Sequence, residues 1–272
     1  ISQASRQMTA SWHCHDCFNR MPPAAVAGGI AVVIDVIRAS TTITTALAHG
    51  AVAVYPRESV EESRRLLERL GPGTLAGGER KSLRIEGFDL GNSPREYRRE
   101  TVEGRRIVFT TTNGTAALAA CRSAATILVG GLVNRSAVAA AAEAEARRHG
   151  VDVHLVCAGT DGEVTGEDLL GAGGILAALE GTRCRLDKQA RAALDRFRDA
   201  VGGSRGEKRA KLLVPLLAVT AGGRRMAEVG MQDDLPLAAA IDAYDLVPVF
   251  ESDTGRLTPW RREPGAAHTV TR

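Results

Sequence analysis

Residues 30–42 read Ile-Ala-Val-Val-Ile-Asp-Val-Ile-Arg-Ala-Ser-Thr-Thr, in which an apolar run is followed by a turn rich in polar groups. Ile30 to Ile34 has the length and the β-branched composition of a strand that is buried on both faces. Ile43 to His49 has helical spacing and ends at Gly50. This part of the chain therefore predicts a strand, a polar turn and a helix.

The same unit recurs further along the chain. Short apolar runs lead through turns rich in Gly, Thr or Asn into Ala-rich stretches with helical spacing. The predicted strands of these units cover residues 51–55, 107–109, 127–129 and 153–157. Strands that alternate with helices at this spacing indicate a sheet covered by helices on both faces. The predicted fold class is therefore α/β, a three-layer α/β/α arrangement with a mostly parallel or mixed sheet.

Residues 30–272 are interpreted as a single α/β domain, because no Pro-rich or Ser-rich linker divides them. The second half predicts an amphipathic helix over 187–201, a helix that begins at Asp233 or Asp234 and runs to Ala243, and a last strand over 246–250 before a polar tail.

Residues 1–29 have no clear periodicity and are interpreted as a loosely ordered N-terminal arm. The arm contains the cluster His13-Cys14-His15-Asp16-Cys17. The usual zinc patterns need a second ligand pair further along the chain, which is missing here. We therefore expect the arm to be dispensable for activity.

The composition is that of a soluble globular protein, with 44% hydrophobic and 25% charged residues. The net charge of +3 is spread along the chain, so neither a nucleic-acid partner nor a membrane surface is expected. Five irregularly spaced cysteines are interpreted as reduced thiols, and a cytoplasmic location is expected. A small anionic ligand fits this composition, and a homodimer remains open.

Three predicted strand-to-helix turns have unusual composition, and ligands of open α/β sheets bind at such turns. In the first turn, Asp35 and Arg38 precede the hydroxyl groups of Ser40, Thr41 and Thr42. A guanidinium and the N–H groups at a helix start would bind an oxyanion. The alternative is that the hydroxyls cap the helix and Asp35 caps a turn.

The second turn is Thr110-Thr111-Thr112-Asn113-Gly114-Thr115. Three consecutive threonines are poor helix starters, whereas hydroxyl and N–H groups around an Asn-Gly turn form a nest for an anion. A hydrogen-bonded tight turn is the alternative. The turn is not a Walker loop, because no Gly-Lys-Ser or Gly-Lys-Thr follows it.

The third turn runs from Cys157 through Gly159 and Thr160 to the acidic pair Glu167-Asp168. A carboxylate here that faces Asp35 would supply the few oxygen ligands that Mg²⁺ needs, although acidic residues at a helix start are often only favourable to the helix dipole. A fourth candidate is the long Gly-rich connection that holds Glu79, Arg80 and Asn92, where Arg80 would bind the ligand. A surface loop with solvated charges is its alternative.

Together, these motifs resemble the successive signatures of the 2-phosphosulfolactate phosphatase family. The resemblance rests on segments that occur in the family's order. They are residues 35–42, 78–80 with 87–94, 110–115, 157–159 with 167–168 and 172–173, and then Ala221-Gly222-Gly223, Asp233-Asp234 and Val247-Pro248. Lys81-Ser82 departs from the Asn-Gly that is frequent in this family, and residues 1–29 match poorly.

The resemblance implies Mg²⁺-dependent hydrolysis of 2-phospho-3-sulfolactate to 3-sulfolactate and phosphate, a step of coenzyme M synthesis. The predicted catalytic residues are Asp35, Arg38, Glu167 and Asp168. The predicted metal ligands are Asp35, Glu79 and Asp168. The predicted substrate-binding residues are Arg38, Ser40, Thr41, Thr42, Arg80, Asn92, Thr111, Thr112, Asn113, Gly114, Thr115, Gly159 and Thr160.

Three points of chemistry stay open at this level. The attack on phosphorus could come from water or from the Asp35 carboxylate through a covalent aspartyl-phosphate. The substrate could be another small phosphorylated hydroxy acid. A protein that binds a phosphometabolite without chemistry is a third alternative, although carboxylates beside each basic turn do not help a pure anion binder.

Overall fold

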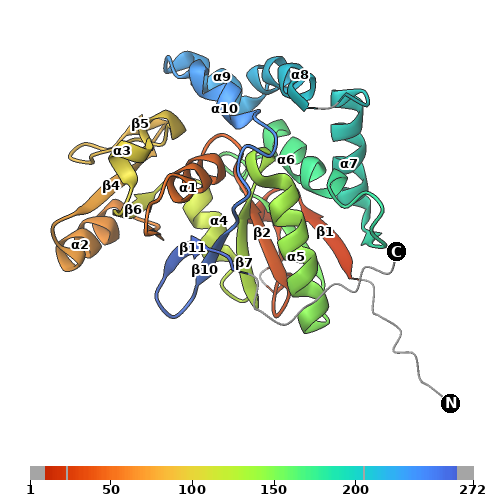
Figure 1. The fold of residues 1–272 in the computed structure, drawn as a ribbon, viewed down its shortest axis with the longest axis horizontal. Coiled ribbons are helices and arrows are strands. Elements are labelled where there is room, and N and C mark those ends of the chain that lie inside the picture. The colour runs from red at the N-terminus through yellow and green to blue at the C-terminus, as the bar shows by residue number, and fades with distance from the viewer. Residues whose placement is uncertain (1–9, 23, 205, 262–272) are drawn as a thin grey trace.

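The computed structural model of the protein describes residues 10–22, 24–204 and 206–261. In this part of the chain one mixed sheet has the strand order β5-β4-β6-β3-β11-β10-β7-β2-β8-β1-β9 (Figure 1). Its strands are β1 (Ser11–His15), β2 (Ile30–Ile34), β3 (Ala53–Pro56), β4 (Thr74–Arg80), β5 (Leu83–Arg84), β6 (Arg106–Thr110), β7 (Thr126–Gly130), β8 (Val153–Cys157), β9 (Arg185–Leu186), β10 (Pro248–Glu251) and β11 (Arg256–Pro259).

Helices cover both faces of the sheet, so the predicted three-layer α/β class is confirmed. The helices are α1 (Ala39–Ala48), α2 (Val60–Leu70), α3 (Arg99–Val102), α4 (Gly114–Ala120), α5 (Arg135–His149), α6 (Gly166–Ala177), α7 (Lys188–Val201), α8 (Gly206–Ala218), α9 (Ala221–Glu228) and α10 (Leu235–Ala238). Short 3₁₀ turns lie at Phe18–Arg20, Pro94–Glu96, Leu132–Asn134 and Gln232–Asp234. No helix among the described residues combines the length and apolar character that a membrane crossing requires.

Strand β2 is buried along its whole length and divides its side chains between two cores. Ile30, Val32 and Ile34 pack in the core that α5, α6 and α7 cover. Ala31 and Val33 point to the opposite face, where α1 and α4 complete the second core. Because both faces are apolar, the strand has no polar alternation, and this explains why its sequence is a continuous apolar run.

The sheet contains two groups of parallel strands that an antiparallel hairpin joins. Strand β2 pairs in parallel with β7 and β8, and β6 pairs in parallel with β3 and β4. The hairpin lies between the groups, with β10 antiparallel to β7 and β11 antiparallel to β3. The predicted strand over 246–250 overlaps β10, whereas β11 lies in residues that were interpreted as a polar tail.

The interpretation of residues 1–29 as a loose arm is wrong for the segment that forms β1. This strand pairs in parallel with β8 and places Cys14 opposite Leu155. Trp12 and Cys14 are fully buried, while the neighbouring side chains are only partly buried. The missed sequence signal was the alternation of polar Ser11, His13 and His15 with apolar Trp12 and Cys14. Residues 1–9 of the predicted arm lie outside the described residues.

Strand alternation also splits the cluster of His and Cys residues in β1. His13 and His15 lie on the same face as His154 of β8, and their rings stack on it with centroid distances of 5.0 and 5.4 Å. Cys14 points into the core on the other side. The five residues of the cluster therefore do not converge on one point.

Two further segments differ from their predictions. Gly77–Arg80, predicted in a loop, belongs to β4, where Gly78 has φ 140° and a Cβ atom would lie 2.0 Å from the Thr110 carbonyl oxygen. Glycine permits this close approach of β4 to β6, although it is uncommon in strands. The helix predicted to end at Ala243 stops at Ala238, because the backbone of Asp242 donates to the Leu132 carbonyl instead.

We predict that Trp12→Ala lowers the free energy of unfolding by about 3–5 kcal/mol, because it empties a fully buried site in the core. Its Nε1 atom also donates to the Glu143 carboxylate at 3.4 Å. Urea denaturation of the full chain measures the effect. Trp12→Phe, which keeps most of the apolar contact, should lose clearly less. An unchanged unfolding midpoint for Trp12→Ala would contradict a structural role of β1.

Candidate active site

Four acidic side chains that were predicted as site residues come together beside the turn after β2. Asp35 follows β2, Glu79 lies in β4, and Glu167 with Asp168 begins α6. All four are buried, with at most 8% of each residue exposed. The structure therefore unites carboxylates that are separated by up to 133 positions in the sequence.

Asp168 ties the turns after two neighbouring strands. One carboxylate oxygen accepts a hydrogen bond from the Val36 N–H after β2, and the other accepts from the Gly159 N–H after β8, both at 2.9 Å. Gly159 has φ 65°, and a Cβ atom there would lie 2.5 Å from the Glu163 carbonyl oxygen. The Thr160 N–H donates to that same carbonyl at 3.0 Å, so this turn is closed on itself.

Glu79 ties the Thr-rich turn to the loop that follows β4. Its carboxylate accepts from the Thr112 N–H at 2.8 Å and from the Ser82 N–H at 2.6 Å. The side chains of Thr111 and Thr115 close the turn, because each hydroxyl accepts from the backbone N–H of the other residue at 3.2–3.3 Å. A buried carboxylate thus organises this turn as Asp168 organises the other two.

The hydroxyl groups of the first turn are engaged inside the protein. Ser40 accepts from the Asp35 N–H at 2.9 Å, and Thr41 donates to the Val36 carbonyl at 2.8 Å. Thr42 donates to the Asn92 carbonyl at 2.8 Å. None of these bonds caps α1, which has no side-chain cap, so the capping alternative does not describe the three hydroxyls. Because they are engaged inside the protein, anion contacts at this turn are left to other groups.

Arg38 is almost fully buried and forms an ion pair with Asp234, at 2.8 Å from Nη1 to the carboxylate. Its Nη2 atom donates to the Ser82 carbonyl at 3.0 Å. The other oxygen of Asp234 accepts from the Ser93 hydroxyl at 2.6 Å. Arg38 therefore connects the turn after β2 with the β4 loop and with the 3₁₀ turn that holds Asp234. Its charge is neutralised by this partner.

The remaining predicted residues lie around these turns. Arg80 donates from Nη2 to the Thr110 hydroxyl at 2.9 Å and is half-buried. Asn113 precedes α4, and a Cβ atom on Gly114 would lie 2.7 Å from a carboxylate oxygen of Asp35. Gly114 thus brings the Thr-rich turn directly against Asp35. Asn92 is buried, and its side-chain oxygen has no hydrogen-bond partner among the described residues.

The acidic cluster changes the protonation of its members. Burial raises the pKa of Asp35 to about 7, a hydrogen bond from the Ala39 backbone opposes this rise, and the nearby charges of Glu79 and Glu167 add to it. Burial likewise raises the pKa of Asp168, and the charges of Asp35 and Glu167 raise it further. Carboxylates that raise one another's pKa lie close together with too little positive charge between them.

Comparison with known proteins agrees with this arrangement of motifs. The profile of the family described as 2-phosphosulpholactate phosphatase matches residues 17–253, which is most of the chain. The chain belongs to this family. A probable 2-phosphosulfolactate phosphatase of Symbiobacterium thermophilum is 40% identical over 235 residues, which are 85% of this chain and 95% of that relative.

Two further relatives carry the same name. The protein of Caldanaerobacter subterraneus subsp. tengcongensis is 38% identical over 223 residues, 81% of this chain and 87% of the relative. The protein of Clostridium perfringens strain SM101 is 46% identical, but the match covers only 57% of this chain and 62% of that relative. Both are described as probable 2-phosphosulfolactate phosphatases.

In this member of the 2-phosphosulpholactate phosphatase family, sequence reasoning missed the role of Asp234. The residue lies 196 positions from Arg38, so no local pattern connects the two. The Gly222 N–H, which donates to Glu167 Oε1 at 2.9 Å, was missed for the same reason. The only sequence signals were the motifs Asp233-Asp234 and Ala221-Gly222-Gly223 of the family resemblance.

We predict that Asp234→Asn lowers the free energy of unfolding by about 3–5 kcal/mol, because the variant leaves the Arg38 guanidinium buried without a counter-charge. Chemical denaturation measures the loss. The matched control is Asp233→Asn, which breaks the exposed 3.0 Å pair with Arg95 and should cost about 1 kcal/mol or less. Equal losses of unfolding free energy in the two variants would contradict a larger stabilising contribution of the buried pair.

The raised pKa of Asp35 predicts a pH-dependent stability. In the presence of a chelator, the Asp35 carboxyl group loses its proton near pH 3.8 in the unfolded chain and near pH 7 in the folded chain. Ionisation of Asp35 therefore destabilises the fold progressively as the pH rises between these values. Asp35→Asn removes this penalty. We expect the variant to melt at a higher temperature than the unchanged protein at pH 8, with a difference that shrinks as the pH falls toward 4. A difference independent of pH would contradict the shifted pKa.

Proposed function

We propose that the protein is a phosphoric monoester hydrolase that releases phosphate from 2-phosphosulfolactate. Membership of the 2-phosphosulpholactate phosphatase family supports the reaction class, and the shared name of the relatives supports the substrate. The convergence of Asp35 with three other buried carboxylates at the strand-to-helix turns is the observation that carries the proposal. Such a cluster is costly to bury and is expected where acid–base or cation chemistry takes place.

The charge balance of the site favours a divalent cation as a partner of the reaction. Arg38 is neutralised by Asp234, so Arg80 is the predicted basic residue that remains for the substrate. A substrate that carries phosphate, sulfonate and carboxylate groups is repelled by four buried carboxylates unless a cation lies between them. We therefore propose Mg²⁺, which prefers oxygen ligands.

The carboxylate oxygens of the site fit a Mg²⁺ ion that is held by only a few protein ligands. No group of three or more His, Cys, Asp or Glu side chains in the described ranges forms a ready metal cage. Mg²⁺ commonly uses only one or two carboxylates and keeps waters or substrate oxygens as its other ligands. Both oxygens of Glu79 and of Asp168 accept backbone N–H bonds, whereas the buried Oε2 of Glu167 has no partner in the described part of the chain.

These contacts favour Asp35 and Glu167 as the residues that would hold Mg²⁺, with Glu79 and Asp168 as positioning residues for the turns. When bound, Mg²⁺ would supply the positive charge that a transferred phosphoryl group requires. Without a cation Asp35 has a pKa of about 7, and a cation held there would favour its ionised form. Arg80 and the Thr112 turn would orient the phosphate group. A role in coenzyme M synthesis and a cytoplasmic location stay predictions.

Phosphate release from 2-phospho-3-sulfolactate and from a panel of other phosphorylated hydroxy acids, with and without Mg²⁺, tests this function. We expect the sulfonate substrate to be preferred and chelation to abolish turnover. We also predict that Asp35→Asn retains its fold and loses activity by about a hundredfold or more, since it removes the charge but keeps the size of the side chain.

The matched control is Asp199→Asn, which changes an exposed acid on α7 and should turn over normally. Full activity after exhaustive chelation would overturn the role of Mg²⁺. Normal turnover by folded Asp35→Asn would exclude Asp35 from the chemistry. Binding of the substrate without any phosphate release, over the whole panel and with Mg²⁺ present, would overturn the hydrolase and favour a binding protein.

A further inference from the structure

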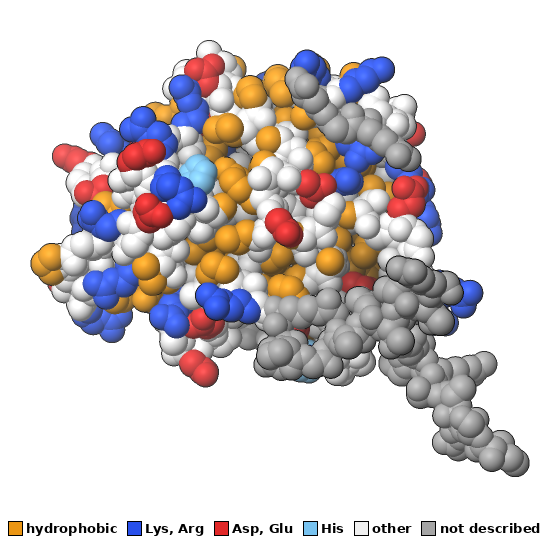
Figure 2. All heavy atoms as spheres, in the orientation of Figure 1, with side chains coloured by type: hydrophobic (Ala, Val, Ile, Leu, Met, Phe, Trp, Pro, Cys, Tyr) orange, Lys and Arg blue, Asp and Glu red, His pale blue; other side chains and the backbone are white. Residues whose placement is uncertain are grey.

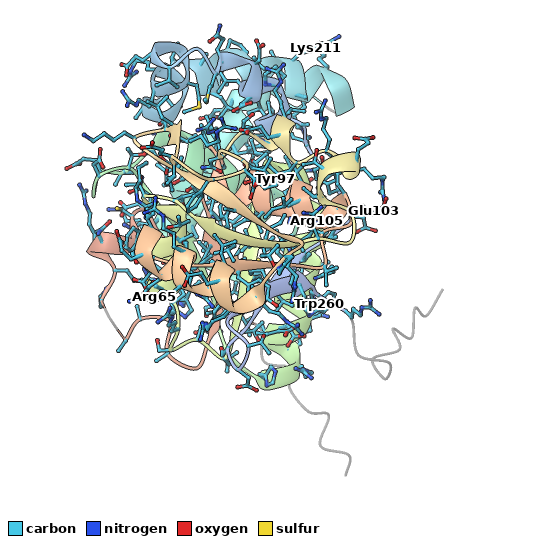
Figure 3. All side chains as sticks on the ribbon, turned by 90° about the vertical axis from the view of Figure 1, so that its left-hand side faces the viewer. Arg65, Tyr97, Glu103, Arg105, Lys211 and Trp260 are labelled. Atoms are coloured by element: carbon cyan, nitrogen blue, oxygen red, sulfur yellow. The ribbon has the colours of Figure 1, made fainter. Side chains whose placement is uncertain are left out.

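A hollow of about 740 Å³ lies outside the candidate active site, between α2 and the β10–β11 hairpin. Four arginines line it together with Glu62 and Phe250; they are Arg57, Arg65, Arg69 and Arg122. Lys and Arg side chains gather over the α2 side of the molecule, at the left of Figure 2, and Figure 3 shows Arg65 at the surface of that helix. None of these residues belongs to the candidate active site.

Three separate elements bring the arginines together. Arg65 and Arg69 are four positions apart on α2, so they lie on one face of the helix. Arg57 follows β3, and its Nη1 atom donates to the carbonyls of Pro56 at 2.6 Å and Gly255 at 3.0 Å. These bonds hold a half-buried guanidinium at the wall of the hollow. Arg122 follows α4 and lies on another side.

The positive charge of the hollow is only partly balanced. Glu62 lines the hollow, and Glu58 contacts Arg122 at 3.3 Å, so four guanidinium groups face two carboxylates. Burial lowers the pKa of Arg57, Glu62 opposes this, and the charges of Arg69 and Arg122 lower the pKa further. Arginine stays protonated in proteins, so this repulsion cannot be relieved by loss of a proton. Arg65 and Arg69 have no carboxylate partner among the described ion pairs.

We propose that this hollow is a second ligand site, which binds a small anion that carries a diphosphate group. Planar guanidinium forks bind phosphate oxygens in pairs, and arginines from three elements can contact two linked phosphates at once. The concave shape and the volume suit a small molecule, whereas a nucleic-acid backbone requires an extended basic stripe. Phe250 adds an apolar wall on which a base or ring could rest.

Titration calorimetry of the full chain with inorganic pyrophosphate, without added metal, tests the proposal. We expect the doubly substituted variant Arg69→Gln/Arg122→Gln to bind pyrophosphate about tenfold or more weakly at this site, because it loses two charged donors. These arginines are exposed, so the variant should fold. The matched control is Arg64→Gln, whose guanidinium donates to the Glu86 carbonyl away from the hollow. This control should bind as the unchanged protein does.

Two further measurements distinguish a diphosphate site from general attraction of anions to a basic surface. ATP should bind at least as tightly as pyrophosphate, and tighter binding of ATP would add a base contact to the proposal. Phosphate release from 2-phospho-3-sulfolactate should be unchanged in the double variant. The proposed second site is therefore tested independently of the proposed function. The proposal would be overturned if the unchanged protein, the double variant and Arg64→Gln bound pyrophosphate equally. It would also be overturned if NaCl of equal ionic strength gave the same calorimetric signal as pyrophosphate, or if the protein bound a short RNA but not pyrophosphate.

Discussion

Buried carboxylates that accept hydrogen bonds from backbone N–H groups are the constraint on which the candidate site depends. Asp168 bridges the turns after β2 and β8, and Glu79 bridges the Thr-rich turn and the loop after β4. A carboxylate that accepts two such bonds recovers part of the solvation it loses on burial. Loops with few apolar side chains can thus be held in one arrangement by acidic groups in place of hydrophobic contacts.

This way of building the site leaves an uneven distribution of charge. Asp234 neutralises Arg38, while Oε2 of Glu167 has no hydrogen-bond partner among the described residues and burial raises the pKa of Asp35 to about 7. Neutral carboxyl groups or a bound cation would both relieve the repulsion, and the pKa of about 7 for Asp35 reflects the first of these when no cation is present. Under the proposed function, a bound cation would relieve the repulsion when an anionic substrate enters.

The arginine hollow has the opposite electrostatic problem at a different place in the fold. Guanidinium groups from α2, β3 and the end of α4 face one another with too few carboxylates. The hollow depends on the antiparallel hairpin between the two parallel strand groups, since this hairpin contributes Phe250 and Gly255 to it. The protein therefore separates an acidic centre from a basic one on a single sheet.

The sequence by itself determined the α/β class, the central strand over residues 30–34 and the turns that hold Asp35, Thr112 and Asp168. These features are local, because an apolar run buried on both faces and polar residues at a strand end can be recognised in the sequence without knowledge of their tertiary contacts. The family resemblance likewise rests on short segments in a given order, and these segments contain most of the residues that line the candidate site.

Only the tertiary structure decided the pairing of Arg38 with Asp234, the use of Glu79 and Asp168 as ties between turns, and the place of β1 in the sheet. Each of these features includes a partner that lies 33 to 196 positions away along the chain. A carboxylate has the same local sequence whether it binds a cation, a guanidinium or two backbone N–H groups, because its role is set by the groups that folding brings within about 3 Å.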